Sequence, residues 1–290
     1  MIDKTLILDG AMGTELTKRG VETKLPLWTA ESNISHPFLV EQVHKEYIHA
    51  GADIITTNTF RSTCWSYQRA GFTNTKAQLR AKRSLYSAVE CAHKASGGAV
   101  KVAGSITTLN DCYEPENFPG RNVALDNYGQ TLDWLIDSGV DMVLFETMGN
   151  LEEIDIALSL SSKYDKPIWL SIIMKSEEKI LDGTILGKIL FLANQYPVEA
   201  ILINCNNIIS TIVSLKIVQT YWAKKWGAYP NLGVNDYSNE YFNIIPKTQF
   251  IAGMKNILKL KPNIIGCCCG STPLHIKFLK KLTKGTMKCI

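Results

Sequence analysis

The sequence lacks a long hydrophobic run that could cross a membrane or serve as a secretion signal. Only four residues, Thr5 to Leu8, separate Lys4 from Asp9 near the N-terminus, which is too short a stretch for either purpose. The basic amphipathic segment 277–284 has too small an apolar face for a membrane anchor and is expected to be a solvated helix face. We therefore expect a cytoplasmic protein without a membrane partner.

A strong charge of one sign is also absent. The chain has 31 basic and 27 acidic residues, a net charge of +4, and no basic stripe interleaved with aromatic residues. Nucleic-acid binding is therefore not indicated. With 290 residues, of which 46% are hydrophobic and 20% charged, and with no low-complexity linker, the composition indicates a single globular domain over residues 1–290. The sequence leaves the oligomeric state open.

Short apolar runs rich in β-branched residues alternate with longer segments of helical periodicity. Pro37 to Ala50 and Thr75 to Ala95 are two such segments, because their apolar residues recur at helical spacing. This alternation predicts an α/β protein, a closed (β/α)8 TIM barrel. An open doubly wound sheet is the alternative that periodicity alone does not exclude. The eight predicted strands are Leu6 to Leu8, Asp53 to Thr57, Val100 to Ala103, Met142 to Phe145, Ile168 to Ile173, Ala200 to Ile203, Trp226 to Tyr229 and Asn263 to Ile265.

Polar or otherwise special residues follow most of these predicted strands. In a barrel of this type the loops after the strands meet at one end and form the active site. We therefore expect these residues to converge. They are Asp9, Gly10, Asn58, Gly104, Ser105, Glu146, Cys205, Asn231 and the triplet Cys267, Cys268 and Cys269.

The eight cysteines are more naturally metal ligands or core residues than disulfides in a reducing compartment. Cys64, Cys91 and Cys112 are expected to be core residues. The triplet 267–269 is different, because adjacent side chains on a strand point to opposite faces and cannot fill one core. Soft thiolates held this close suit zinc, and Cys205 supplies a third ligand from another strand. Three protein ligands leave one position for water or substrate, as in catalytic zinc sites.

The glycine-containing segment Asp9 to Glu15 is a weak signal by itself. It lacks the Lys-Ser/Thr pair of a P-loop and the third glycine of a dinucleotide fingerprint. It is either a tight strand-to-helix turn or a loop whose backbone amides hold a carboxylate. None of the five histidines is assigned to catalysis.

Several motifs of the chain recur together in one known family. The most specific are Asn204-Cys205 and the closing Cys268-Cys269-Gly270-Ser271-Thr272-Pro273. The supporting motifs are Leu8 to Leu16, Gly51-Ala52-Asp53, Thr57 to Phe60, Gly104-Ser105, Phe145-Glu146-Thr147, Asp182-Gly183-Thr184 and Tyr229-Pro230-Asn231. From end to end, the sequence resembles the homocysteine S-methyltransferases, which are zinc-dependent thiol methyltransferase barrels.

The resemblance implies that Cys205, Cys268 and Cys269 are the zinc ligands. Cys267 stands where the family usually has a glycine, and Gly270 favours this register. Without the resemblance, the choice of two ligands from the triplet stays open.

The resemblance also implies a substrate site. Asp9 and Glu146 would hold the amino acid, with Glu146 accepting from its ammonium group, and Gly10 and Asn231 are expected beside them. Trp28 lies where the betaine-using branch has an aromatic residue that meets its cationic donor, which suits a cation–π contact. A core role for Trp28 is equally open.

The chain departs from the family after Gly104-Ser105, where many relatives continue with Gly-Pro. Here the sequence reads Ile106-Thr107-Thr108-Leu109-Asn110-Asp111. We expect the loop over the site to differ accordingly.

The expected reaction is methyl transfer to homocysteine, which gives methionine. Zinc would turn the substrate thiol into a thiolate, and the thiolate would displace a methyl group from a small donor. S-methylmethionine or S-adenosylmethionine is preferred, because each leaves as a neutral thioether and needs no general acid. Because the predicted barrel takes up the 290 residues, we expect a small donor rather than a corrinoid, unless a separate protein supplies one. Two alternatives remain, a methyltransferase for another thiol or selenol such as selenocysteine, and an inactive zinc-binding barrel with a sensor or structural role.

Overall fold

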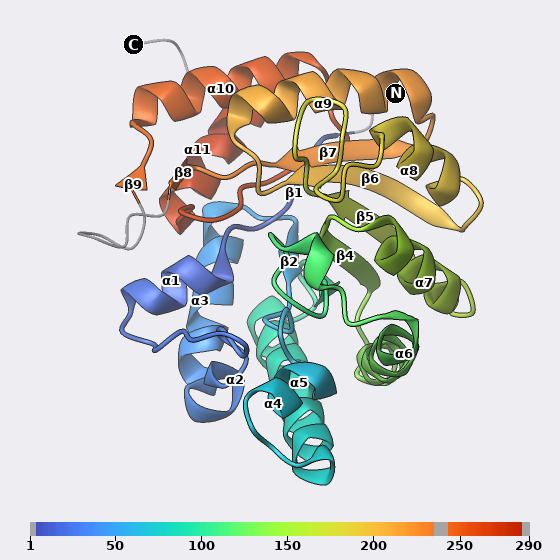
Figure 1. The fold of residues 1–290 in the computed structure, drawn as a ribbon. Helices are drawn as coiled ribbons and strands as arrows, with labels where there is room; N and C mark the ends of the chain where they lie inside the picture. Colours follow the sequence, from blue (N-terminus) through green and yellow to red (C-terminus); the bar gives the residue numbers. More distant parts are fainter. Residues whose placement is uncertain (1–3, 235–242, 286–290) are drawn as a thin grey trace.

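The computed structural model describes residues 4–234 and 243–285, and its centre is a ring of eight parallel strands surrounded by helices (Figure 1). These strands are β1 (Leu6–Ile7), β2 (Ile54–Thr56), β3 (Lys101–Ile106), β4 (Met142–Met148), β5 (Ile168–Ile172), β6 (Val198–Asn204), β7 (Lys225–Tyr229) and β10 (Ile264–Ile265). Their hydrogen-bonded order is β1-β10-β7-β6-β5-β4-β3-β2. Leu8 and Ile54 form a parallel bridge between the two end strands, and Asp53 N donates to Ile7 O at 2.7 Å. The ring therefore closes, which confirms the predicted barrel over the open sheet.

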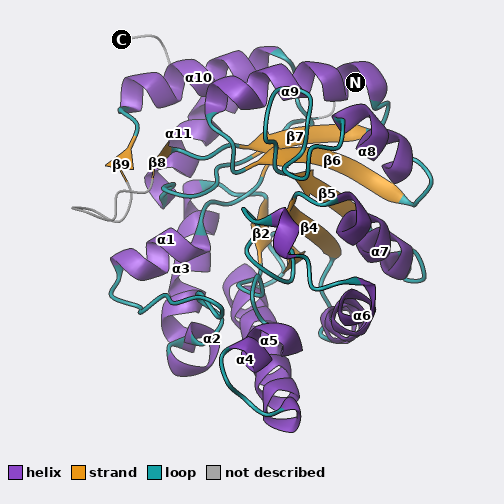
Figure 2. Ribbon diagram, viewed as in Figure 1, coloured by secondary structure: helices purple, strands orange, loops and turns teal. Residues whose placement is uncertain are grey.

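Helices connect successive strands and cover the outside of the ring (Figure 2). The predicted helix Pro37 to Ala50 is observed with the same ends, and Thr75 to Ala95 is one residue longer at each end. The helices are α1 (Met12–Lys18), α2 (Ser32–Ser35), α3 (Pro37–Ala50), α4 (Cys64–Arg69), α5 (Asn74–Ser96), α6 (Arg121–Asp137), α7 (Leu151–Ser161), α8 (Leu186–Ala193), α9 (Ile208–Tyr221), α10 (Lys247–Lys259) and α11 (Pro273–Thr283), with a 3-10 turn η1 (Pro115–Asn117). A short hairpin, β8 (Gly233–Val234) with β9 (Asn243–Ile244), was not predicted.

All eight predicted strands are present, but four of them, β3, β4, β6 and β7, extend beyond the predicted ends. β4 continues past Phe145 to Met148, so that Glu146 lies inside the strand rather than after it. The pairing of β4 with β5 shifts register between Phe145 and Met148. Such an irregularity bends a strand and redirects its side chains. Thr147, inside this irregular segment, has a φ of +60°, a local conformation that was not predicted.

Side chains of the strands divide between two cores, because successive residues point to opposite faces. On β4, Val143 and Phe145 belong to the core between the strands and the helices, whereas Met142 and Leu144 belong to a second core inside the ring. This second core fills the barrel below the site. Its buried members are Leu8, Ile54, Ala103, Met142, Leu144, Trp169, Ala200, Leu202, Tyr229 and Ile264.

Glycine is required where β7 and β10 run closest together. A Cβ on Gly227 would lie 2.0 Å from the carbonyl oxygen of Ile264, its partner in the pairing register. Because displacing the hydrogen-bonded backbone of β10 costs free energy, any side chain at this position would destabilise the pairing of β7 with β10. The close approach holds the segment after β10 against the ends of its neighbouring strands.

Among the described residues, no helix is long and apolar enough to cross a membrane.

Candidate active site

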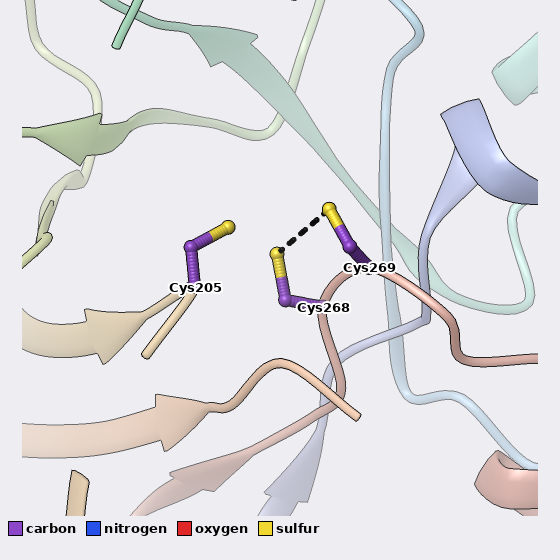
Figure 3. A group of neighbouring side chains, drawn as sticks. All are labelled: Cys205, Cys268 and Cys269. Atoms are coloured by element: carbon purple, nitrogen blue, oxygen red, sulfur yellow. Dashed lines mark hydrogen bonds between the residues drawn. The ribbon is translucent and has the colours of Figure 1, made fainter. Parts of the chain in front are cut away.

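Three cysteines from two strand ends meet at one end of the barrel. Cys205 directly follows β6, and Cys268 and Cys269 follow β10. Their Sγ atoms all lie within 4.8 Å of one another, and the side chain of Cys205 points toward the other two (Figure 3). Cys205 has a φ of +54°, a conformation that non-glycine residues rarely adopt outside functional sites. Soft sulfur donors converging on one point can hold a metal ion.

Backbone hydrogen bonds hold the second and third cysteines in place. Cys268 N donates to Pro230 O at 2.8 Å, and Leu232 N donates to Cys269 O at 3.0 Å. Gly270, with a φ of +78°, then reverses the chain. Hydrogen bonds from Cys205 and Cys268 lower the pKa of Cys269 well below its usual value, whereas the pKa values of Cys205 and Cys268 are raised. In the absence of a cation the three thiols therefore favour one negative charge, on Cys269.

Cys267 takes no part in this cluster. Its side chain is 2% exposed and packs in the core between the strands and the helices. Burial raises the pKa of its thiol, as expected of a small core residue. The alternation of neighbouring side chains thus separates Cys267 from Cys268, and the structure brings together the same three cysteines that the family resemblance implied.

Two buried carboxylates lie in the pocket that the cysteines line. Asp9 accepts from Thr56 N at 2.8 Å and from Thr56 Oγ1 at 3.0 Å, and burial raises its pKa. Glu146 accepts from Ser105 Oγ and from Tyr229 Oη. Burial raises the pKa of Glu146 to about 7. Both carboxyl groups lack a cationic side-chain partner within the described part of the chain, an arrangement suited to a cationic ligand.

The bent segment of β4 that carries Glu146 is tied to the strand that carries Cys205. Thr147 N donates to Asn204 Oδ1 at 3.2 Å, and Asn204 Nδ2 donates back to Thr147 Oγ1 at 2.8 Å. Ser171 Oγ also donates to Asn204 Oδ1, at 2.7 Å. This buried network fixes the carboxylate of Glu146 relative to the cysteine cluster.

A model of the family described as homocysteine S-methyltransferase matches residues 6–283. The chain belongs to the homocysteine S-methyltransferase family. It is therefore a methyltransferase. It is 29% identical to a homocysteine S-methyltransferase of Escherichia coli, over 97% of this chain and 96% of the relative. It is 26% identical to a selenocysteine methyltransferase of Astragalus bisulcatus, over 96% and 92% of the two chains. The metallated form of the homocysteine methyltransferase MmuM from Escherichia coli superposes with a TM-score of 0.84, at 26% identity over 96% of each chain.

The glycine loop of this family member is a tight turn packed against the cysteine segment. Gly10 lines the pocket, but the next amide, Ala11 N, already donates to Ser271 Oγ at 2.8 Å. A Cβ on Gly13 would lie 2.4 Å from Nε1 of Trp28. The Trp28 ring occupies the space that a side chain on Gly13 would need. Trp28 also lines the pocket.

Asn231 is the predicted substrate residue that the structure leaves outside the pocket lining. Its backbone N donates to Asn206 O at 2.8 Å. Its Oδ1 atom is buried and accepts no hydrogen bond from the described residues. It precedes Leu232, whose amide supports Cys269. Asn231 is therefore next to the backbone that supports the cysteine segment, and its role toward the substrate stays a prediction.

The sequence interpretation missed the pocket residues of the loop between β3 and α6. Asp111, Cys112 and Tyr113 all line the pocket, as does Arg61. Cys112 is buried, as predicted, yet it lies in the wall of the site rather than in a remote core. The available signal was their position after the third predicted strand, where barrel loops face the active site.

Proposed function

We propose that this chain is a zinc-dependent homocysteine S-methyltransferase that takes the methyl group from a small cationic donor. The observation that carries the proposal is the convergence of Cys205, Cys268 and Cys269 within 4.8 Å, in one pocket with Glu146 and Asp9. One wall offers sulfur ligands and another offers buried carboxylates. Homocysteine, which carries a thiol and an ammonium group, matches both.

The three cysteines would hold the zinc ion and leave its fourth position open to the substrate sulfur. Sulfur donors without a nearby histidine or carboxylate ligand are the set that zinc prefers over calcium or magnesium. When bound, zinc supplies the charge that keeps the homocysteine thiol deprotonated at neutral pH. The metallated form of MmuM supports the presence of a metal ion in this site.

Glu146 and Asp9 would receive the ammonium group of homocysteine. An ammonium ion beside Glu146 lowers the pKa of its carboxyl group, so that the charged pair forms on binding. Ser105 and Tyr229 hold the carboxyl group in position. Because the carboxylates and the cysteines lie in one pocket, anchoring the ammonium directs the thiol toward the cluster. Glu146 and Asp9 would thus contribute to the reaction by orienting homocysteine.

The donor would enter from the side of Trp28 and Phe60, which also line the pocket. A bond forms between the homocysteine sulfur and the methyl carbon while the bond from that carbon to the donor sulfonium breaks. The bonding electrons stay on the donor sulfur, which leaves as a neutral thioether, and the thiol proton has already passed to solvent. Opposite charges are neutralised in this step, so a pocket that excludes water favours it. S-methylmethionine and S-adenosylmethionine both provide such a leaving group.

A second acceptor is supported by two relatives. The selenocysteine methyltransferase of Astragalus bisulcatus and a selenocysteine Se-methyltransferase of Brassica oleracea are 26% and 27% identical to this chain. A selenol can bind through the same cysteine-held metal ion as a thiol. Selenocysteine is thus the alternative acceptor, and competition between it and homocysteine for one donor measures the preference.

The test combines metal analysis with product formation on one reduced sample. Homocysteine is offered with S-methylmethionine, S-adenosylmethionine and betaine in turn, and methionine is measured. We expect one zinc ion per chain and methionine from a sulfonium donor, with both lost in Cys268→Ala. Cys64→Ala is the matched control, because Cys64 is a buried cysteine outside the pocket. Bound zinc without methyl transfer to homocysteine or selenocysteine would instead indicate a sensor or structural role.

A further inference from the structure

The loop between β3 and α6 forms a wall of the pocket that the proposed reaction has not used. It starts after Ile106 and ends at Arg121, and it includes the 3-10 turn η1. Asp111, Cys112 and Tyr113 line the same pocket as the cysteine cluster. The loop follows the position where the sequence departs from the usual Gly-Pro of the family.

Two buried charged residues anchor the start of this loop. Arg61 is 4% exposed, and its Nη1 donates to the carbonyl oxygens of Thr108, at 2.9 Å, and Asn110. Glu153 of α7 is 2% exposed and accepts from Leu109 N at 2.8 Å. Buried charges that bind backbone groups hold those groups tightly, because losing either partner leaves a buried group unsatisfied. The following residues are therefore presented in a fixed position.

The anchored loop presents a carboxylate and an aromatic ring to the pocket. Asp111 Oδ1 accepts from Tyr113 N at 3.0 Å, which fixes the turn between them. Tyr113 lines the same pocket as Cys205, Cys268 and Cys269. It is also 51% exposed. The residue therefore lies where the pocket meets solvent.

The pocket is poor in positive charge. Among the described residues that line it, Arg61 is the cationic side chain, and its Nη1 is engaged with loop carbonyls. Asp9, Asp111 and Glu146 are carboxyl groups of the same pocket. Asp9 is buried, whereas Glu146 and Asp111 are both partly buried. Glu146 lies inside β4, and Asp111 lies on the loop between β3 and α6. Asp111 is thus the carboxylate available to a donor after homocysteine has taken the other two.

We propose that Asp111 and Tyr113 form the donor-binding wall and select methyl donors of net positive charge. The inference rests on the proposed function. A sulfonium amino acid such as S-methylmethionine carries a net charge of +1, because its sulfonium and ammonium groups outweigh its carboxylate. Betaine carries one quaternary ammonium and one carboxylate, and its net charge is zero. Asp111 attracts the first donor and gains little from the second, while the Tyr113 ring contacts the methylated cation together with Trp28.

Binding calorimetry on Asp111→Asn tests the charge selection directly. Asparagine keeps the oxygen that accepts from Tyr113 N and removes only the charge. We expect the dissociation constant of S-methylmethionine to rise about tenfold and that of betaine to stay the same or fall. The KM for homocysteine and the zinc content should not change. Asp165→Asn is the control, because Asp165 is an exposed carboxylate just before β5, at the opposite end of the barrel.

Substitution of the aromatic ring provides the second measurement. Tyr113→Phe keeps the ring and should bind S-methylmethionine like the wild type, whereas Tyr113→Leu should weaken binding by about fivefold. If Asp111→Asn and Tyr113→Leu both keep the wild-type preference for S-methylmethionine over betaine, the inference is wrong even though methyl transfer stands. If the wild type binds S-methylmethionine selectively but forms no methionine, the proposed reaction fails and the charge selection stands. Equal binding of both donors by the wild type would also overturn the inference.

Discussion

Replacing Glu146 with glutamine should stabilise the fold and weaken homocysteine binding. Burial raises the pKa of Glu146 from its ordinary value of 4.5 to about 7. The folded protein therefore holds this proton more tightly than the unfolded chain does. The contribution of Glu146 to stability is most favourable below pH 4.5 and declines as the pH rises to about 7. At about 1.4 kcal/mol per pH unit, the decline amounts to about 3 kcal/mol.

Glutamine has no proton to lose in this range, so the decline disappears in Glu146→Gln. Its carbonyl oxygen can still accept the hydrogen bonds of Ser105 and Tyr229. The free energy of unfolding of metal-free protein is measured in urea at about pH 5 and about pH 8, on either side of this titration. The variant should gain up to about 3 kcal/mol over the wild type at the higher pH only. Glu152→Gln, an exposed carboxylate of α7, serves as the control.

The same variant loses a charged partner for the substrate ammonium. Hydrogen bonds to charged groups contribute about 1.5–3 kcal/mol, so the KM for homocysteine should rise about 10- to 100-fold. In the wild type, kcat/KM for homocysteine should fall below about pH 7 as Glu146 becomes protonated, and this fall should be absent from the variant. An equal effect of the substitution on stability at both pH values, with an unchanged KM, would refute the assignment of Glu146 as a buried, titrating substrate ligand.

Three further substitutions test the neighbouring elements. Cys267→Ala should leave the zinc content at the wild-type value and reduce stability by about 1 kcal/mol through lost core packing, and a loss of zinc would place Cys267 in the cluster. Gly13→Ala puts a Cβ at 2.4 Å from Nε1 of Trp28, so the ring should move and tryptophan fluorescence should change. The free energy of unfolding in urea should fall by about 1–3 kcal/mol. Glu153→Ala leaves the buried Leu109 N unpaired, while Tyr128 Oη keeps Thr107 O as an acceptor. The substitution should cost about 1–3 kcal/mol and raise the KM for the donor more than that for homocysteine. An equal rise in both would mean that the loop does not face the donor.

Local patterns in the sequence were sufficient for the strands and for the cysteine cluster. Central parallel strands are buried on both faces, so each appears as a short apolar run whatever its neighbours are. The cysteine cluster could be predicted for a similar reason. Cys205 and Cys268 follow two such runs, and barrel geometry brings the ends of parallel strands to one edge. The chemistry of sulfur then indicates a soft metal ion, because this preference belongs to the atoms themselves.

Features that depend on a partner strand could not be predicted in this way. The irregular pairing of β4 with β5 beyond Phe145 brings Glu146 and Thr147 into the strand. This pairing depends on how the two strands align with each other, which the residues of one strand alone do not reveal. Likewise, nothing in the run Tyr229-Pro230-Asn231 indicates that Tyr229 lines the pocket and Asn231 does not. Its place follows from the hydrogen bonds between this loop and residues 268–269.

Local periodicity and motifs along the chain predicted an α/β barrel with an open sheet as the alternative, and the family resemblance then pointed to Cys205, Cys268 and Cys269. Closure of the ring and the residues that complete the pocket followed from the tertiary structure. Arg61 and Glu153 are distant in the sequence from each other and from Tyr113. Together they nevertheless anchor the loop that carries Asp111 into the site. Their effect depends on burial, which removes competing water and makes each charge hold its backbone partner, and burial is a property of the folded chain alone.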